Sequence, residues 1–256
     1  MDQQLFGNYQ WVKKTQGNLS WKEKIHVLRN SLVPTTQHLF SQFITKKSNA
    51  EIRFQEILIP DTPYIKEAVE YVENQIHDTV LAHSWRTFYW GSFFAMDRQF
   101  DFDPEVFLIS ALFHDIGLGQ HHPESCTCFC YHSALITEDW AKNLHYPEDK
   151  TQLVLDSICL HMNGSETSEA AIEIRMLQWG TSCDVIGQQL HSIPAQLQKE
   201  ILHHYPLQNF HAYMQEQINF EKKFYPQTRT ALLSNIGLNQ LIQLHQRQLN
   251  QQIPQK

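Results

Sequence analysis

Apolar residues recur every three or four positions over most of this chain, which is the spacing that places them on one side of an α-helix. The stretch 79–98 is the most aromatic, and its apolar residues surround most of the helix circumference. We therefore expect a buried central helix there. No segment alternates apolar and polar residues for long enough to form a sheet, so the pattern predicts an all-α fold.

Capping residues mark where two of the expected helices begin. Thr62 can cap a helix that starts at Pro63, and helical periodicity then continues to about residue 77. Asp103-Pro104 starts the next helix, which is expected to end at Ile116-Gly117. Further helices are predicted over about 20–45, 132–144, 148–162, 169–190, 194–204, 208–223 and 229–248.

The remaining segments are expected to be irregular. Residues 1–18 are polar and are predicted to be loosely ordered, and 53–59 is interpreted as a connector. A Cys/His-rich loop is expected over 118–131, and the tail Asn250–Lys256 is expected to fray.

The chain is long enough for one large domain. We expect residues 60–190 to form a core, with 1–59 packing on it as an extension. The C-terminal helices of 191–256 are expected to complete the same domain.

Composition narrows the functional classes. Only nine of the 256 residues are glycine, which favours helices over glycine-rich β folds. The formal charge of −7 argues against binding to nucleic acid or to an anionic membrane, and the expected partner is a small-molecule substrate. A homo-oligomer stays open.

The N-terminus has no apolar signal region, and no apolar run is long enough to span a bilayer. The five cysteines are an odd number, and three of them crowd into 126–130. Such an arrangement is a poor disulfide framework, so a cytoplasmic location is expected.

The strongest local motif is Leu112-Phe113-His114-Asp115-Ile116-Gly117. Neighbours on a regular helix point about 100° apart and rarely share a ligand. At a loosening helix end they can converge on one ion, and Gly117 is placed to end the helix. A buried Asp115 needs a cation, and an imidazole with a carboxylate suits a divalent metal. The alternative is a helix-ending Asp beside a packed His.

His83 lies inside the expected central helix, where a histidine is costly unless it has a partner. It is interpreted as a metal ligand, and the alternative is a neutral core histidine bonded to a carbonyl. Arg86 follows one turn later on roughly the same face. It could bind a substrate anion or a metal-bound carboxylate.

Asp184 is flanked by Gly180 and Gly187 at helical spacing. A glycine inside a helix costs about 1 kcal/mol, so a reason is expected. Close approach of this helix to the metal-bearing helices would supply one. The alternative is an exposed Asp beside incidental glycines.

Together, His83, His114-Asp115 and the distant Asp184 resemble the HD superfamily of metal-dependent phosphohydrolases over about residues 60–190. The resemblance implies an HD-domain helical bundle, here with extra N- and C-terminal helices. It also implies one divalent ion held by His83, His114, Asp115 and Asp184. Zinc is preferred, with iron, manganese or nickel as alternatives.

In detail the chain looks like the cyanamide hydratase-like branch, which has a similar aromatic His-bearing helix and a similar terminal Asp-x-Ile-Gly. This likeness implies addition of water to a nitrile-type carbon. A Phe-Glu pair is expected after the His-Asp motif in that branch, and Tyr131-His132 stands here instead. The identity of the substrate is therefore left open.

Two further histidines are expected to look into the site. His161 shares an inward face with Val154 and Ile158, and His132 opens the helix after the Cys/His-rich loop. Either could transfer protons, because imidazole titrates near neutral pH. A packed core His161 and a two-metal site that uses both histidines are the alternatives.

The Cys-x-Cys-x-Cys run of 126–130 does not have the usual spacing of structural zinc. It is interpreted as a lid or pocket-rim loop with reduced thiols.

The expected mechanism activates water on the ion, with Asp115 as both ligand and proton acceptor. Lysine and arginine are sparse across 100–174, which favours a small neutral substrate over a polyphosphate. A phosphohydrolase of a nucleotide or phosphoester is one alternative. A ligand sensor that has lost turnover is another.

Overall fold

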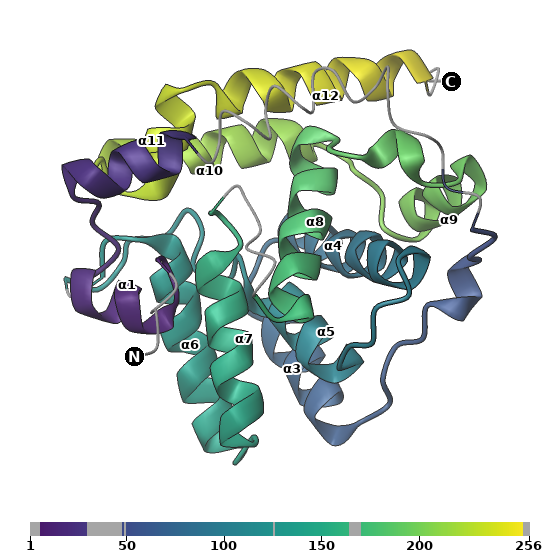
Figure 1. Cartoon of the computed structure of the whole chain (residues 1–256), viewed down its shortest axis with the longest axis horizontal. Helices are drawn as coiled ribbons and strands as arrows, with labels where there is room; N and C mark the ends of the chain where they lie inside the picture. The colour runs from purple at the N-terminus through teal and green to yellow at the C-terminus, as the bar shows by residue number, and fades with distance from the viewer. Residues whose placement is uncertain (1–5, 30–47, 49, 125, 164–169, 253–256) are drawn as a thin grey trace.

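The computed structural model describes residues 6–29, 48, 50–124, 126–163 and 170–252, and every regular element among them is helical. The prediction of an all-α fold with at least seven helices is therefore confirmed. The helices form a lower body, and a layer of C-terminal helices lies across its top (Figure 1).

Helix α4 (Asp78–Asp97) is the central element, as its aromatic pattern predicts. Its buried residues cover most of its circumference, and they include Phe88, Trp90 and Phe93. It packs along α8 (Ile172–Ile186), and the two helices touch at Gly180. A Cβ atom on Gly180 would lie 2.3 Å from the carbonyl oxygen of Thr87, so only glycine permits this approach.

The predicted helix starts are confirmed. Thr62 caps α3 (Pro63–Glu73) by accepting a hydrogen bond from the amide of Ile65. Asp103 caps α5 (Pro104–Phe113) by accepting from the amides of Glu105 and Val106. These caps fix where the two helices enter the core. Helices α6 (Phe129–Asn143) and α7 (Glu148–Leu160) pack beside α5.

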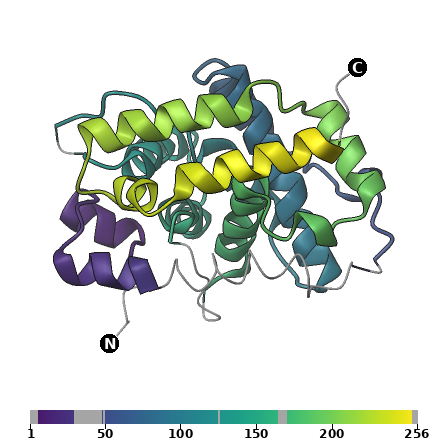
Figure 2. The ribbon, with the colours of Figure 1, turned by 90° about the horizontal axis from the view of Figure 1, so that it is seen from above.

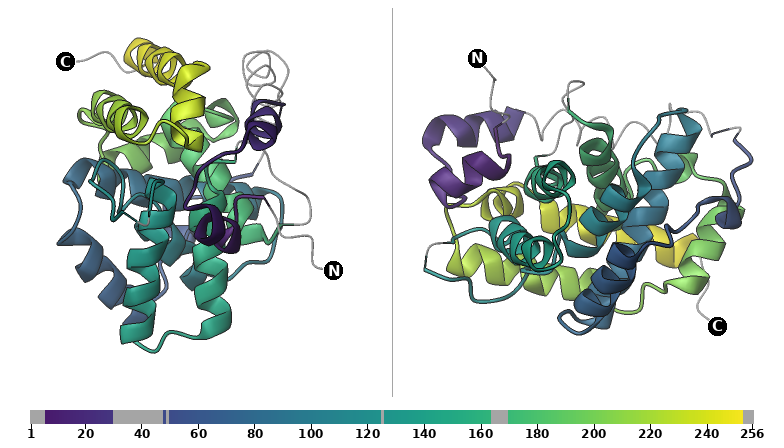
Figure 3. Two further views of the ribbon diagram at one scale, coloured as in Figure 1. Left: turned by 90° about the vertical axis from the view of Figure 1, so that its left-hand side faces the viewer. Right: turned by 90° about the horizontal axis from the view of Figure 1, so that it is seen from below.

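The C-terminal layer consists of α10 (Phe210–Phe224), α11 (Arg229–Asn235) and α12 (Leu238–Gln252). Helices α10 and α12 run side by side across the molecule (Figure 2). Seen from the end, this layer lies above the lower body that contains α6 and α7 (Figure 3), and it packs on α4 and α8. Helix α9 (Ala195–His204) and the short 3₁₀ turns η1 (Phe54–Glu56) and η2 (Leu190–Ser192) complete the described elements.

The structure differs from the sequence-based expectation at the N-terminus. Residues 1–18 were expected to be loosely ordered, but α1 (Tyr9–Thr15) is a capped helix within this segment. Tyr9 is buried, and its amide donates to Asp156 of α7. Two apolar side chains on one face, Tyr9 and Val12, suffice to dock this short helix on the core.

Other boundaries also differ. The helix expected over 229–248 is broken into α11 and α12 because Gly237 has a φ of +119°, which no regular helix contains. Helix α6 begins at Phe129, inside the expected loop. The helix expected over 20–45 is described only as far as residue 29, and its remainder lies outside the described residues. No described helix has the length and apolar character of a membrane span.

Candidate metal centre

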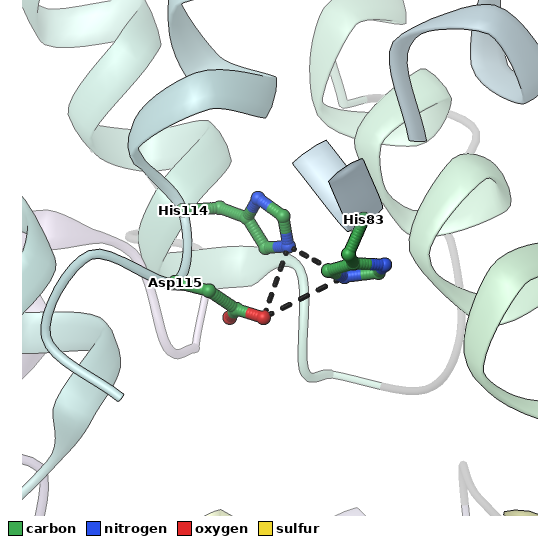
Figure 4. Close-up of side chains that lie close together, drawn as sticks. All are labelled: His83, His114 and Asp115. Carbon is green, nitrogen blue, oxygen red and sulfur yellow. Dashed lines mark hydrogen bonds and ion pairs between the residues drawn. The ribbon is translucent and has the colours of Figure 1, made fainter. Parts of the chain in front are cut away.

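His83, His114 and Asp115 converge on one point in the core, and we call these three residues the triad. Their side chains point toward one another from α4 and from the end of α5 (Figure 4). The distance from His83 Nε2 to His114 Nε2 is 3.1 Å. Asp115 Oδ2 lies 3.5 Å from His83 Nε2 and 3.3 Å from His114 Nε2.

These separations fit a shared metal ion. An ion at about 2.0–2.2 Å from each ligand, with bond angles between octahedral and tetrahedral, sets ligand–ligand distances of roughly 2.8–3.6 Å. All three edges of the triad lie within that range. The triad is also almost fully buried, since Asp115 is its most exposed member at 5%.

The hydrogen bonds of the two imidazoles orient them for metal binding. Nδ1 of His114 donates to the carbonyl oxygen of Ala111 at 2.8 Å, and Nδ1 of His83 donates to Asp184 at 2.7 Å. With Nδ1 protonated, each neutral ring presents an Nε2 lone pair to the triad. With both rings in this neutral form, two lone pairs and a carboxylate oxygen face one point, and a cation there would satisfy all three.

The local backbone explains how neighbouring residues share one point. Helix α5 ends at Phe113, and His114 is its C-cap. The next turn is tightened, because the amide of Ile116 donates to the carbonyl of Phe113 three residues back. Gly117 allows α6 to pass close to this turn, since a Cβ there would lie 2.9 Å from the amide of Ser133. The tightened turn at the end of α5 therefore brings His114 and Asp115 together.

Asp184, which was expected to be the fourth ligand, lies behind His83. Its Oδ2 accepts a hydrogen bond from His83 Nδ1, and Arg86 donates one hydrogen bond of 2.7 Å to each carboxylate oxygen. The indole of Trp90 donates to Oδ1 at 2.9 Å. Burial alone would raise its pKa, but Arg86 and His83 hold the pKa of Asp184 well below its usual range. In this arrangement Asp184 is an ionised carboxylate that orients His83, as partners of metal-ligating histidines do.

Arg86 is fully buried and does not face the cavity beside the triad. Besides its two bonds to Asp184, it donates through Nη1 to the carbonyls of Tyr205 and Pro206. Its guanidinium also lies over the ring of Phe210. Of its two expected roles, this geometry matches binding of a carboxylate of the site. The four hydrogen bonds of its guanidinium are all made to protein groups that do not line the cavity.

His161 enters the site from the end of α7. Its Nδ1 donates to the carbonyl of Ile158 at 2.6 Å, so its Nε2 lone pair faces Asp115 Oδ1 at 3.7 Å. Burial, together with the nearby His114, lowers the pKa of His161 to about 3. A neutral imidazole therefore lines the cavity next to the triad.

His132 does not look into the same cavity, contrary to the expectation. It lies on the far side of Gly117, and its ring is 5.1 Å from that of His122. His122 in turn contacts the buried Glu221 of α10 at 3.2 Å. Because Gly117 has no side chain, α6 lies so close to this turn that a Cβ on Gly117 would be 3.0 Å from the Cβ of His132, which therefore packs against the turn and outside the cavity.

The cysteines of the Cys/His-rich segment are internal. Cys126, Cys128 and Cys130 are buried free thiols, and α6 begins among them. Of residues 126–130, only Phe129 lines the cavity beside the triad. The thiols are reduced, as expected, and lie in the core, whereas residues 119–124 are half-buried or exposed.

A cavity of ≈ 120 Å³ opens directly beside the triad. Its floor contains the triad and His161, and its other polar side chains are Thr181, Ser182 and Thr230. The rest of its lining is apolar and consists of Leu118, Phe129, Met162, Val185, Ile186, Met214, Ile218, Leu233 and Leu238.

The C-terminal residues that line this cavity were not predicted from the sequence. Met214 and Ile218 come from α10, Thr230 and Leu233 from α11, and Leu238 from the start of α12. Their only sequence signature is the apolar face of an amphipathic helix, which is shared by ordinary core residues. We call these five residues the roof of the cavity.

The family model of the HD domain matches residues 80–202. No curated protein matches the chain. The matched segment contains the triad, His161, Asp184 and Arg86, and it ends before the roof. Residues 80–202 are thus similar to the HD domain, and the helical fold and the buried triad agree with this likeness to the HD superfamily.

Proposed function

We propose that this protein is a metal-dependent hydratase or hydrolase of a small, uncharged and largely apolar molecule. Within that class, the reaction that we favour is cyanamide hydratase-type addition of water to a nitrile-type carbon, which forms an amide. The HD domain and the triad support metal-dependent water chemistry. The cavity beside the triad supports the substrate class, and it is the observation that carries the proposal.

Size restricts the substrate first. A dry protein cavity of about 150 Å³ holds one benzene molecule, which has six heavy atoms. The cavity beside the triad has a volume of ≈ 120 Å³. A substrate with roughly six heavy atoms therefore fits, whereas a nucleotide would have to leave most of its atoms outside.

Charge restricts the substrate further. No lysine or arginine is among the described residues that line the cavity. A phosphoester brings charge that needs cationic side chains in addition to the ion. The buried guanidinium of Arg86 is occupied by Asp184 and two carbonyls. The lining therefore favours a neutral substrate over a phosphate.

Each residue of the site has a separate role in the proposed reaction. A divalent ion held by the triad, with zinc preferred, supplies Lewis-acid activation of water. Asp115 would accept a proton from the attacking water, because its Oδ2 lies within the triad and its Oδ1 faces His161. His161 carries a free lone pair on Nε2 and can pass that proton to the nitrogen of the substrate. Arg86 and Asp184 keep His83 in the metal-binding tautomer.

Phosphoester hydrolysis is the second candidate, and the match to the HD domain favours it, because this family is generally one of metal-dependent hydrolases. The two candidates share the triad and differ in the electrophile. They therefore make opposite predictions for one set of substrates.

The test is metal analysis of the purified protein followed by a panel of small nitriles, phosphoesters and nucleotides. We expect one divalent ion per chain, and turnover of small aliphatic nitriles that stops after chelation and returns with zinc. Turnover of phosphoesters alone would replace the proposal by the second candidate. Metal binding without turnover of any class would favour a ligand sensor.

A further inference from the structure

The cavity beside the triad is open to solvent, and the exposure of its lining residues indicates where. The triad, His161 and most of the lining are buried. The other lining residues are half-buried, and they are Met162, Ser182, Val185, Ile186, Leu233 and Leu238. Because these side chains both line the cavity and meet solvent, we call them the mouth of the cavity.

The residues of the mouth lie close together in the fold. Three of them belong to the C-terminal end of α8, and Met162 follows the end of α7. Leu233 and Leu238 lie on either side of Gly237, where α11 ends and α12 begins. Helix α12 packs against α8 and crosses above it (Figure 1). The mouth is therefore a single opening between the end of α8 and the joint of α11 with α12.

The mouth is apolar. None of its side chains is charged, and its one hydroxyl, that of Ser182, donates to the carbonyl of Gln178 in its own helix at 2.6 Å. A charged or polar group of a ligand would lose part of its hydration among these side chains without gaining a partner. A hydrocarbon group, in contrast, would be stabilised there by leaving water.

The triad and the mouth set the orientation of a ligand. The triad lies at the buried end of the cavity, and the mouth lies at the open end. The buried lining outside the triad is also largely apolar and includes Leu118, Phe129 and Met214. A ligand with its polar group at the triad therefore directs the rest of its atoms along apolar side chains toward solvent.

We propose that the mouth binds a hydrocarbon chain of the substrate, and that Leu233 and Leu238 are specificity-determining residues. The substrate is then a straight-chain aliphatic molecule that has its reactive group at the triad and its chain in the mouth. The volume of the cavity limits the reactive end, whereas the chain can extend outward. This inference rests on the proposed function of the triad. It assigns part of substrate selection to α11 and α12, outside the segment 80–202 that matches the HD domain.

The probes for the test are straight-chain hydroxamic acids, which chelate a divalent ion through two oxygens at one end. A series from acetohydroxamic acid to octanohydroxamic acid is titrated into the zinc-loaded protein in a calorimeter, so no turnover is required. We expect the dissociation constant to fall about 3- to 4-fold for each added methylene, as for a methylene that leaves water. The fall should level off at the length at which the chain passes the mouth.

A charge placed in the mouth tests its residues directly. Leu233→Lys adds a cation at a half-buried position, from which the ammonium group can reach water. At the length where affinity levels off, each alkyl probe is compared with an analogue that ends in a carboxylate. The wild-type protein should prefer the alkyl probe. Leu233→Lys should shift the ratio of dissociation constants about 3- to 5-fold toward the carboxylate, as for a partly exposed ion pair.

Two further variants control this result. Leu232→Lys is the matched control, because Leu232 is the neighbour of Leu233 in α11 and is also half-buried but does not line the cavity. It should keep the wild-type ratio. Leu238→Lys, on the other side of the joint, should act as Leu233→Lys does, and it replaces that variant if Leu233→Lys does not fold.

Each other outcome counts against a specific step. Affinity that stays constant or falls with chain length would overturn the path through the mouth while leaving metal binding intact. An unchanged ratio in Leu233→Lys and Leu238→Lys, or an equal shift in Leu232→Lys, would do the same. Failure of every hydroxamic acid to bind the zinc-loaded protein would instead contradict the metal centre, and the inference would fall with it. The expected dependence on chain length without turnover of nitriles would contradict the proposed reaction and support the role of the mouth.

Discussion

Asp184 supports the candidate metal centre from behind His83, one of the three residues of the triad. Its carboxylate is shared by Arg86, Trp90 and His83, and all its hydrogen bonds are 2.7–2.9 Å long. Replacing any of these partners would leave a buried charge poorly compensated. We therefore expect substitutions within the triad to weaken metal binding more than substitution of Asp184.

The first prediction separates a ligand from an orienting residue. His114→Ala should abolish stoichiometric binding of zinc, because it removes one corner of the triad. Asp184→Asn should lower zinc affinity by about 10- to 100-fold, which is typical when the partner of a metal-ligating histidine is changed. Competition with a chelator of known affinity measures both. Complete loss of zinc in Asp184→Asn as well would instead support direct ligation by Asp184, the role expected from the sequence.

The second prediction concerns proton transfer. His161→Ala should retain the metal but lose turnover by about 10²-fold or more, as expected for a general acid–base group. His132→Ala is the matched control, because His132 lies outside the cavity, and its turnover should change little. The measurement is kcat on the best nitrile with metal content determined in parallel. Unchanged turnover in His161→Ala would reduce His161 to a packing role, and loss of a second ion would indicate a two-metal site.

At the scale of elements, the pairing of α4 with α8 decides whether the site forms. His83 and Arg86 come from α4, and Asp184 comes from α8. Glycines at the contact let these helices approach closely. Gly180 lies against the backbone of Thr87, and Gly91 lies near the carbonyl of Met176. Gly187, the other flanking glycine, has a different role: it ends α8 in a left-handed conformation with a φ of +72°.

The third prediction tests this contact. Alanine is about 1 kcal/mol better than glycine in an exposed helix. Gly180→Ala should nevertheless destabilise the protein by about 1–3 kcal/mol, because its Cβ would overlap a backbone oxygen that cannot rotate away. Urea unfolding followed by circular dichroism gives the free energy. Gln243→Ala, on the exposed face of α12, is the control and should stay within about 0.5 kcal/mol. A Gly180→Ala variant as stable as the control would refute tight packing at this point.

At the scale of the whole molecule, buried neutral histidines link stability to pH. Burial lowers the pKa of His161 to about 3 and that of His211 to about 4, from an ordinary value of 6.5. For His161 the nearby His114 adds to this effect. The unfolded chain therefore takes up protons below about pH 6.5 that the folded protein takes up only near pH 3–4. Stability is full above pH 6.5 and falls as the pH drops through this window.

The fourth prediction follows from that sign. Between pH 7 and pH 5, each of the two histidines should remove about 2 kcal/mol from the free energy of unfolding. Urea unfolding of the chelator-treated protein measures this, because no metal is then released. His211→Gln, which cannot be protonated, should show a shallower dependence than the wild-type protein. A free energy of unfolding that stays constant from pH 7 to pH 5 would contradict burial of these imidazoles in the neutral form.

The sequence by itself determined the features that depend on local spacing. These features depend on residues that are close together in the sequence. They are the aromatic pattern of 79–98, the caps at Thr62 and Asp103, and the His114-Asp115 pair at a helix end. They were enough to predict the helical class, two helix starts and the order of the site residues. The short α1 was missed because two apolar residues are too weak a pattern to stand out.

Only the tertiary structure decided which side chains share a cavity. The spacing of apolar residues predicts which face of a helix is buried, but not which other segment packs against that face. His132 packs against Gly117 outside the cavity. Asp184 lies behind His83, where Arg86 donates hydrogen bonds to its carboxylate. Thr230 of α11 lines the same cavity as the triad, although more than a hundred residues separate them in the sequence. These placements arise from packing between distant segments, so no local pattern in the sequence encodes them.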